Sequence, residues 1–358
     1  MAVLTGGRAV LLTCRDEQLD SLLALRRIAA HLGDLPRLGR EDARRPEARR
    51  PGAALVCDDE AATAHLVRLG VPVLHVSSAP FTAAGPPGAL ARAHWPDWLD
   101  RPPGVRPTGL LAPTRLTRNR DRRGALLLLS LWGVPVAEAE SFTADRLPAL
   151  IDEAVRRTGC CTVVCDTALD LVRAAAAGRP GASVARAADT NVDARHAESE
   201  LLLASPTMAA LALARARRAP LSFLPPLGPA QRALAGQLAR LVPIPTLDQT
   251  GLTAPPPPTP PAGPTAPADL VSPADLVNPV GRTSSTAPVG PTAPATSTTP
   301  AAPAGPAHPA GPAHPVDPAV WLPPSPEVQW APLGPELDDL RGAQAVARTV
   351  RQLLLAPL

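Results

Sequence analysis

The sequence has no lysine and no tyrosine, and it contains only three phenylalanines and five tryptophans. Aromatic side chains make up 2% of the chain, too few for the stacking surfaces that bind single-stranded nucleic acid. All 35 basic residues are arginines, and the 32 acidic residues leave a formal net charge of only +3. Because acids and arginines are mixed along the apolar parts, no broad basic surface is expected, and we exclude nucleic acid as a partner.

Long apolar runs are also missing. The longest, from Gly124 to Ala139, is too short and too interrupted to span a bilayer. The N-terminal stretch has an arginine in its apolar part and no small-residue cleavage site, so it predicts a first strand rather than a signal peptide. We therefore expect a cytoplasmic protein with no membrane span.

Cysteine is scarce and its pattern does not indicate a metal site. The five cysteines lie on or beside apolar runs typical of strands, at Cys14, Cys57, Cys160, Cys161 and Cys165. The Cys-Cys-x-x-x-Cys spacing is not that of a zinc site, and no histidine lies near it in sequence. We expect reduced thiols packed in a sheet, with no metal and no cofactor.

What the chain does have is repeated alternation of strand and helix, in two blocks. In the first block RAVLLTC, AALVC and PVLHV are predicted strands, and helical patterns follow the first two. Residues 33–52, rich in arginine and proline, predict a solvated loop, with an anion-binding patch as the alternative. After a charged linker at 113–123, the pattern restarts with GALLLLSLWG, CCTVVCD, ASVARA and ELLLA as strands. This predicts an α/β fold of two Rossmann-like parallel-sheet domains, at 1–112 and 124–249, with a cleft between them.

The composition changes near residue 250. Residues 251–320 contain 20 prolines, and their only charged residues are three aspartates and one arginine. We expect 250–317 to be a disordered Pro/Ala/Thr-rich insertion and a candidate surface for a protein partner. Its His308 and His314 could be metal ligands, but a tether without a role in metal binding is the simpler interpretation.

Order is predicted to return in a C-terminal segment at 318–358. The last helical pattern has an apolar face that needs a surface to cover, and one of the two α/β domains is the natural candidate. The face consists of Leu337, Leu340, Val346, Val350 and Leu353.

The stretch SPTMAALALARARRAPLSFLPPLGPAQ holds the clearest binding signal. Ser205 is a suitable N-cap and Pro206 suits a first helical turn, so we expect a helix that ends before Pro220. LSFL is a predicted buried strand, and a second helix follows near Gln231. A helix N-terminus that directly follows a strand presents free N–H groups to anions.

Four features of the chain form a recognisable set: SLWG (Ser130–Gly133), ASPTMAAL, LSFLPP and Gln231. Together they resemble the donor-binding segments of GT-B glycosyltransferases, and among these the proteins related to cytosylglucuronic acid (CGA) synthase. The resemblance implies that the backbone at Ser205, Thr207 and Met208 holds a nucleotide diphosphate, that Ser130 and Gly133 close the other side, and that Gln231 reaches the sugar. It also implies a UDP-sugar as the most suitable donor, a small-molecule acceptor on the N-terminal side, and hexosyl transfer.

Three departures from that pattern are visible. Leu213 stands where the wider family places an acidic residue for the ribose, and Leu227-Gly228 stands where Gln-Asn is common. TCRDEQ replaces the expected Gly-rich loop with its histidine base.

Glycosyl transfer with inversion needs a base, and Asp16 and Glu17 after the first strand are the predicted catalytic acids. They could equally be first-turn residues that favour a helix dipole. The other candidates are His65, His75, Asp166, which could be an N-cap, and His196 with Glu198, which could be a hydrogen-bonded loop pair.

The sequence leaves three hypotheses about function. The first is a glycosyltransferase that uses a nucleotide diphosphate sugar. The second is a non-catalytic GT-B relative that acts on a partner protein. The third is an interaction protein that works through its Pro-rich segment.

Overall fold

The computed structural model describes residues 9–39, 41, 51–78, 86–100, 106–247, 323–334 and 340–355. The Pro-rich segment predicted at 250–317, with His308 and His314, lies outside these ranges, as does Leu337.

The described chain forms two five-stranded sheets in which every strand pair is parallel. Sheet A has the strand order β2-β1-β3-β4-β5, and sheet B has the order β10-β9-β6-β7-β8. The elements of the sheet A half are β1 (Val10–Cys14), α1 (Leu19–Ala30), β2 (Arg37–Leu38), β3 (Ala53–Cys57), α3 (Glu60–Arg68), β4 (Val73–Ser77) and β5 (Leu90–Ala93).

The sheet B half begins with a strand and a nearly continuous run of helix. Its first elements are β6 (Ala125–Leu129), α4 (Val136–Ser141), η1 (Phe142–Arg146), α5 (Leu147–Thr158), β7 (Cys161–Cys165), α6 (Leu169–Ala176) and β8 (Ala182–Arg186). The remaining elements are η2 (Ala187–Asp189), α7 (Val192–Glu198), β9 (Leu201–Ala204), α8 (Met208–Ala216), β10 (Ser222–Phe223), α9 (Gly228–Leu238), α10 (Pro326–Trp330), η4 (Ala331–Leu333) and α11 (Gly342–Leu355). These two sheets confirm the predicted GT-B-like α/β fold.

The central strands are apolar because both of their faces are covered. In β6, Leu126 and Leu128 join one core cluster, while Ala125, Leu127 and Leu129 join another on the opposite face of the sheet. Side chains alternate between the faces of a strand, so a strand buried on both sides must be apolar at every position. The unbroken run ALLLL is therefore what a central parallel strand requires.

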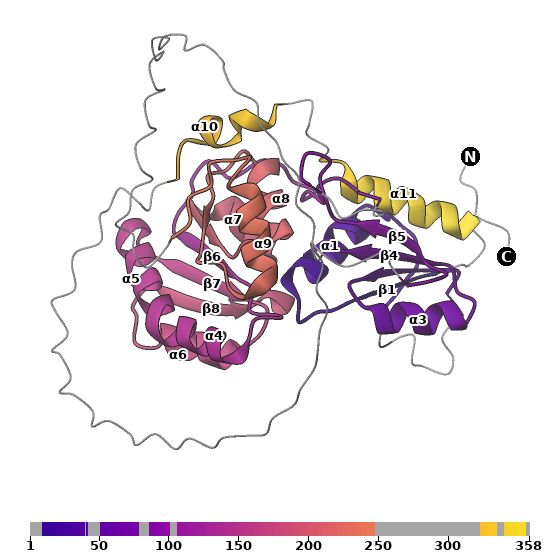
Figure 1. Ribbon diagram of the computed structural model, residues 1–358, viewed down its shortest axis with the longest axis horizontal. Helices are drawn as coiled ribbons and strands as arrows, with labels where there is room; N and C mark the ends of the chain where they lie inside the picture. The colour runs from indigo at the N-terminus through magenta and orange to yellow at the C-terminus, as the bar shows by residue number, and fades with distance from the viewer. Residues whose placement is uncertain are drawn as a thin grey trace, which may run out of the picture. The chain divides into compact units, whose positions relative to one another are not determined.

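Sheet A is covered by α1 and α11 on one face and by α3 on the other (Figure 1). Val346 and Val350 of α11 are buried against residues of β1, β3 and α1, with Leu353 partly buried beside them. The predicted C-terminal helix is thus confirmed, and sheet A is the surface that it covers.

Two local expectations were wrong. The Arg/Pro-rich stretch at 33–52 contains β2, whose two residues pair with Val10 and Leu11 of β1. His196 and Glu198 are not a loop pair, because both lie in α7, where His196 contacts Arg217 and Glu198 forms an ion pair with Arg195. Within the described ranges, none of the helices combines the length and the apolarity needed to cross a bilayer.

The connections place one switch point in each sheet. From β1 the chain goes to β2 on one side and then returns to β3 on the other side of β1. From β6 it moves outward through β7 and β8 and then returns to β9 on the opposite side of β6. In doubly wound sheets the carboxyl ends of the strands at such points are where ligands bind.

Candidate functional site

A cavity of about 130 Å³ lies at the carboxyl ends of the strands at the switch point of sheet B. Four predicted substrate-binding residues line it, namely Ser130, Gly133, Thr207 and Gln231. Ser205 and Met208 are next to this group but are almost fully buried. The structure therefore brings together residues from three separate segments that were chosen from the sequence alone.

The wall of this cavity is held by hydrogen bonds centred on Ser130, the residue that follows β6. Its N–H donates to Ser205 Oγ over 3.0 Å, and its carbonyl accepts from Gln231 Nε2 over 2.8 Å. Its hydroxyl donates to Asp166 Oδ2 over 2.6 Å. Ser130 thus ties together the segments after β6, β7 and β9 and the helix α9.

Both the oxygen and the nitrogen of the Gln231 side-chain amide form hydrogen bonds within the protein. Its Oε1 accepts from the Leu227 N–H over 3.0 Å, while its Nε2 holds Ser130. It fixes the turn between β10 and α9 as well as lining the cavity.

Asp166 follows β7 and is one of the most connected side chains of the described chain. Besides Ser130, it accepts from the N–H groups of Leu131 over 2.8 Å, Thr167 over 2.7 Å and Leu19 over 3.3 Å. Burial raises the pKa of Asp166, although its hydrogen bonds act in the opposite direction. It does not cap α6, whose N-cap is Ala168, so the N-cap interpretation of Asp166 was wrong. Instead, its bond to Leu19 reaches the first turn of α1.

Helix α8 begins later than expected. Its N-cap is Thr207, whose side chain accepts from the Ala210 N–H over 3.2 Å. Ser205 was the expected cap, but its hydroxyl is taken by the Ser130 N–H. The correction moves the helix start two residues along the chain and leaves the Met208 and Ala209 N–H groups open to another partner.

That partner is a carboxylate from the other half of the chain. Asp20, in the first turn of α1, accepts from the Ala209 N–H over 2.7 Å and from the Met208 N–H over 3.3 Å. Burial raises the pKa of Asp20 to about 7, with Asp58 acting in the same direction, and the two N–H bonds oppose the shift. The helix N-terminus predicted to bind an anion is therefore occupied by a carboxyl group of the protein itself.

Asp16 and Glu17, the predicted catalytic acids, do not make this contact, and Asp20 was not among the predicted site residues. Both predicted residues are exposed in the turn after β1, and the cavity is lined by Gln18 and Asp20 instead. The motif DEQLD offers three acids within five residues, and only the tertiary contact with α8 distinguishes the third.

Sheet A supplies the rest of this surface. Asp58, which follows β3 with a φ of 55°, accepts from the N–H and the hydroxyl of Ser78. Ser78 lines the cavity, as does Gln18, a buried residue whose Oε1 has no hydrogen-bond partner within the described structure. Arg15 lies over the Trp132 ring at 5.4 Å, a cation–π contact between the two halves.

The other candidate bases are not at the cavity. His65 is exposed on α3, and His75 is buried in β4, where its Nδ1 lies 2.8 Å from Thr63 Oγ1. His196 is fully buried and its Nδ1 lies 3.0 Å from Arg217 Nη1. Burial lowers the pKa of His196, and so does the neighbouring guanidinium, which keeps this ring neutral.

The cysteines are free thiols, buried at Cys57, Cys161 and Cys165, half-buried at Cys14 and exposed at Cys160. Burial raises the pKa of Cys14, Cys161 and Cys165 to about 12, so these three remain protonated thiols. No group of three or more metal-ligating side chains occurs among the residues that the structure describes.

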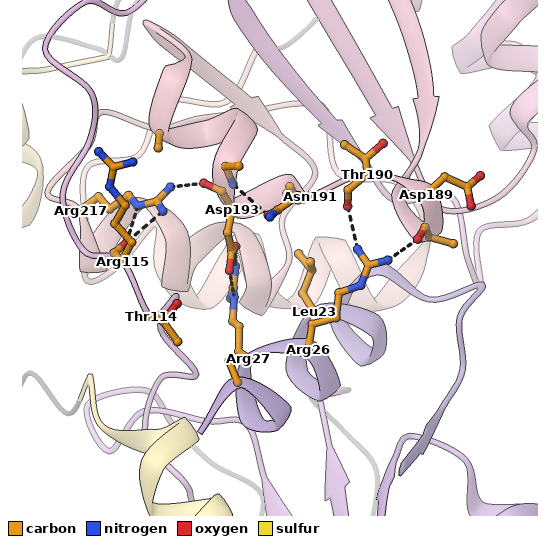
Figure 2. A pocket seen from close by; sticks show the side chains of 15 residues that line it. Leu23, Arg26, Arg27, Thr114, Arg115, Asp189, Thr190, Asn191, Asp193 and Arg217 are labelled. Carbon is orange, nitrogen blue, oxygen red and sulfur yellow. Dashed lines mark hydrogen bonds and ion pairs between the residues drawn. The ribbon is translucent and has the colours of Figure 1, made fainter. Parts of the chain in front are cut away.

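A second, larger cavity of about 490 Å³ lies along α1 (Figure 2). Arg27 forms an ion pair with Asp193 at 2.8 Å, and Arg217 donates to the carbonyls of Asp193 and Arg115. Arg26 donates to the carbonyl oxygens of Ala187, Ala188 and Thr190, just after β8. Helix α1 therefore contributes to both cavities, with its first turn at one and its later turns at the other.

A family model described as CGA synthase-related protein matches residues 10–276 and 298–358. The chain belongs to this family. The match includes the cavity residues from both halves and the C-terminal helix. No curated protein matches the chain.

Among solved structures, several glycosyltransferases are similar in fold. MurG of Acinetobacter baumannii is 12% identical with a TM-score of 0.37, covering 69% of this chain and 87% of MurG. The spinosyn rhamnosyltransferase SpnG with thymidine diphosphate is 15% identical with a TM-score of 0.41, covering 65% of this chain and 84% of SpnG. SnogD from Streptomyces nogalater is 14% identical with a TM-score of 0.37, covering 67% of this chain and 86% of SnogD.

Proposed function

We propose that this chain binds a nucleoside diphosphate sugar at the carboxyl ends of sheet B and transfers the sugar to a small acceptor. The observation that carries the proposal is the α8 N-terminus, which lies at the switch point and already binds a carboxylate through two N–H groups. The dipole and free N–H groups of a helix start favour a diphosphate for the same reason. A UDP-sugar is the first donor to test.

The remaining roles follow from position. Met208 and Thr207 would meet the diphosphate, with Ser205, Ser130 and Gly133 shaping the wall around it. Gln231 would face the sugar, because it lines the same cavity between α9 and β6. Residues 124–249 would form the donor side and residues 1–112 the acceptor side, joined by the linker at 113–123.

In the reaction, the acceptor oxygen bonds to the anomeric carbon as the bond from that carbon to the diphosphate oxygen breaks. The proton of the acceptor hydroxyl passes to a carboxylate, and the nucleoside diphosphate leaves. Asp16 and Glu17 are our proposed bases, since both are exposed in the turn that joins β1 to the cavity wall.

A second candidate is a non-catalytic relative that retains the fold. Two observations favour it. Leu213, at the position where the wider family carries a ribose-binding acid, is fully buried in the core. The cavity, at about 130 Å³, is also smaller than the roughly 300–1,000 Å³ of a ligand pocket.

Thr207→Glu tests the donor site by placing a carboxylate where the diphosphate should lie. Thr207 is almost fully buried, caps α8 and lies next to the N–H groups that bind Asp20, so the fold of the variant is checked by circular dichroism before binding is measured. We expect it to lose binding of UDP and UDP-sugars, measured by isothermal titration calorimetry. Ser325→Glu is the matched control, because Ser325 caps α10, which packs at the start of β10.

The outcomes separate the two candidates. Binding together with sugar transfer or donor hydrolysis supports the transferase, whereas binding without turnover on a panel of acceptors favours the non-catalytic relative. If Thr207→Glu binds UDP as well as the parent does, the site is elsewhere.

We also propose a cytoplasmic location for the protein and a protein partner for the segment at 250–317.

A further inference from the structure

Helix α1 belongs to the sheet A half, yet one of its faces packs at the carboxyl ends of the strands of sheet B. Ala24 and Ile28 pack with strands of sheet A and with α11. Leu19, Leu22 and Leu23 pack instead in a cluster with residues of α8 and α7. The helix is therefore buried on two sides by two different sheets.

Asp20 gives this face an anionic group at the α8 N-terminus. The first four N–H groups of any helix lack partners within the helix. In α8, Thr207 satisfies the Ala210 N–H, and Asp20 satisfies those of Met208 and Ala209. The Met208 N–H is one of the groups that the proposed function assigns to a diphosphate, and the Ala209 N–H is the next along the helix.

Arg26 gives the same face a set of donors two turns further on. Its guanidinium donates to the carbonyl oxygens of Ala188 and Thr190 in the segment after β8 (Figure 2). It donates to the Ala187 carbonyl as well. Three carbonyl oxygens that converge on one planar group form an acceptor surface. Such a surface would otherwise bind an N–H-bearing part of a ligand, of the kind a nucleobase edge offers.

The space that remains beside α1 shows the consequence. With Asp20 in place, the cavity at the α8 N-terminus is about 130 Å³. Ligand pockets have volumes of roughly 300 Å³ or more, so the space at the α8 N-terminus is too small for a diphosphate sugar while Asp20 occupies it. The cavity of about 490 Å³ beside the later turns of α1 stays open. Gln18, whose buried Oε1 lacks a partner among the described residues, lines what is left of the cavity.

We propose that α1 is an internal occupant of the nucleotide site, with Asp20 in the place of the diphosphate and Arg26 in the place of the base edge. The inference rests on the proposed function, which supplies the competing ligand. A nucleotide then binds only when the face of α1 that bears Leu19, Leu22 and Leu23 leaves sheet B. The closed chain is self-inhibited, and its apparent affinity for the ligand is reduced by the fraction of molecules that are open.

The decisive variant is Asp20→Ser with Arg26→Ser, titrated with UDP by calorimetry. Two of the side chains that hold α1 on sheet B are removed, while the α8 N–H groups and the carbonyls after β8 are intact; the Arg27–Asp193 ion pair remains in both proteins. We expect the dissociation constant for UDP to fall by about tenfold or more, as the open fraction rises. Glu153→Ser with Arg156→Ser is the matched control, since it removes an ion pair of 2.5 Å from α5 and should leave the constant unchanged.

A second measurement does not depend on whether the double variant folds. Hydrogen exchange of the parent should increase in residues 19–30 when UDP is added, while exchange at residues 205–212 decreases. A ligand that simply filled an existing pocket would protect both segments.

Each outcome decides something. Tighter binding by the variant, or binding by the variant alone, supports the internal occupant. If parent and variant bind UDP equally, or the variant binds more weakly, the inference is wrong and the proposed function stands. If neither protein binds UDP or any nucleoside diphosphate sugar, the proposed function fails and the inference fails with it.

Discussion

At the residue scale, the protonation of Asp20 affects the stability of the fold. Its carboxyl faces the Met208 and Ala209 N–H groups, and the charged groups that act on its pKa are Asp58, which raises it, and Arg27, which lowers it. Burial raises its pKa from 3.8 to about 7, so the folded protein holds this proton more tightly than the unfolded chain does. The stability that Asp20 contributes is therefore complete below pH 3.8 and is lost as the pH rises through about 7.

The prediction is a difference between two proteins. The free energy of unfolding of the parent, relative to that of Asp20→Asn, should decline steadily between pH 4 and pH 7, measured by urea unfolding. The comparison isolates Asp20 from His94 and His196, whose pKa values are lowered by burial and whose effect on stability has the opposite sign. Asp170→Asn serves as control, because the Asp170 side chain is 99% exposed on α6. A parent that gained stability relative to Asp20→Asn over this range would contradict the pKa shift.

Individual residues were the level at which the sequence misled. In Ser205-Pro206-Thr207 either hydroxyl can cap a helix, and a proline at the first helical position favoured Ser205. Thr207 is the cap because the Ser130 N–H, 75 positions away along the chain, takes the Ser205 hydroxyl. Asp20 was missed for the same reason, since its partner lies in α8. Local pattern cannot rank equivalent polar groups whose partners are distant in sequence.

At the element scale, the start of α11 depends on the absence of a side chain. A Cβ at Gly342 would lie 2.7 Å from the Leu110 carbonyl oxygen and 2.9 Å from that of Thr108. Both are backbone atoms, so neither can move without shifting the segment that joins the two sheets. This close approach presses α11 onto that segment.

Gly342→Ala should therefore destabilise the protein, although alanine is the better helix former. Gly236→Ala in α9 is the matched control, because nothing lies within 4 Å of a Cβ built there. We expect the control to raise the free energy of unfolding by about 0.5–1 kcal/mol, while Gly342→Ala lowers it. Thermal and urea unfolding of both variants would measure this, and equal gains would show that the contact at Gly342 is loose.

The strands show which elements a sequence can predict. β1, β3, β4, β6, β7, β8, β9 and β10 were all recognised, most of them as apolar runs bounded by turn residues. β2 was missed, because an edge strand of two residues needs only backbone hydrogen bonds to β1 and leaves no apolar pattern. β5 was missed as well, since LARA at the other edge is only partly buried.

At the scale of the whole molecule, the amphipathic pattern of α11 showed that it must cover a surface but not which one. The choice of sheet A follows from the packing of Val346 and Val350 beside Ala24 and Ile28. The double burial of α1 was equally hidden. Its leucines predict a helix with an apolar face, whereas the division of that face between two sheets exists only in the assembled chain.

The last prediction concerns the Pro-rich segment, which connects Leu247 to α10 and lies outside the described residues. From its composition we expect no contribution to the folded core. Deleting residues 281–316 removes about half of the connection between Leu247 and α10. Because the closure free energy changes by only about 0.6 kcal/mol for each doubling of loop length, the melting temperature should change by less than about 2 °C.

A second variant, in which Gly/Ser residues replace 281–316 at equal length, separates the effect of length from that of sequence. A loss of many degrees in both variants would show that this segment packs on the fold. A loss in the deletion alone would mean that the span to Gln329 and Trp330, whose side chains bond to Leu221 and Ala219, needs the full length of chain.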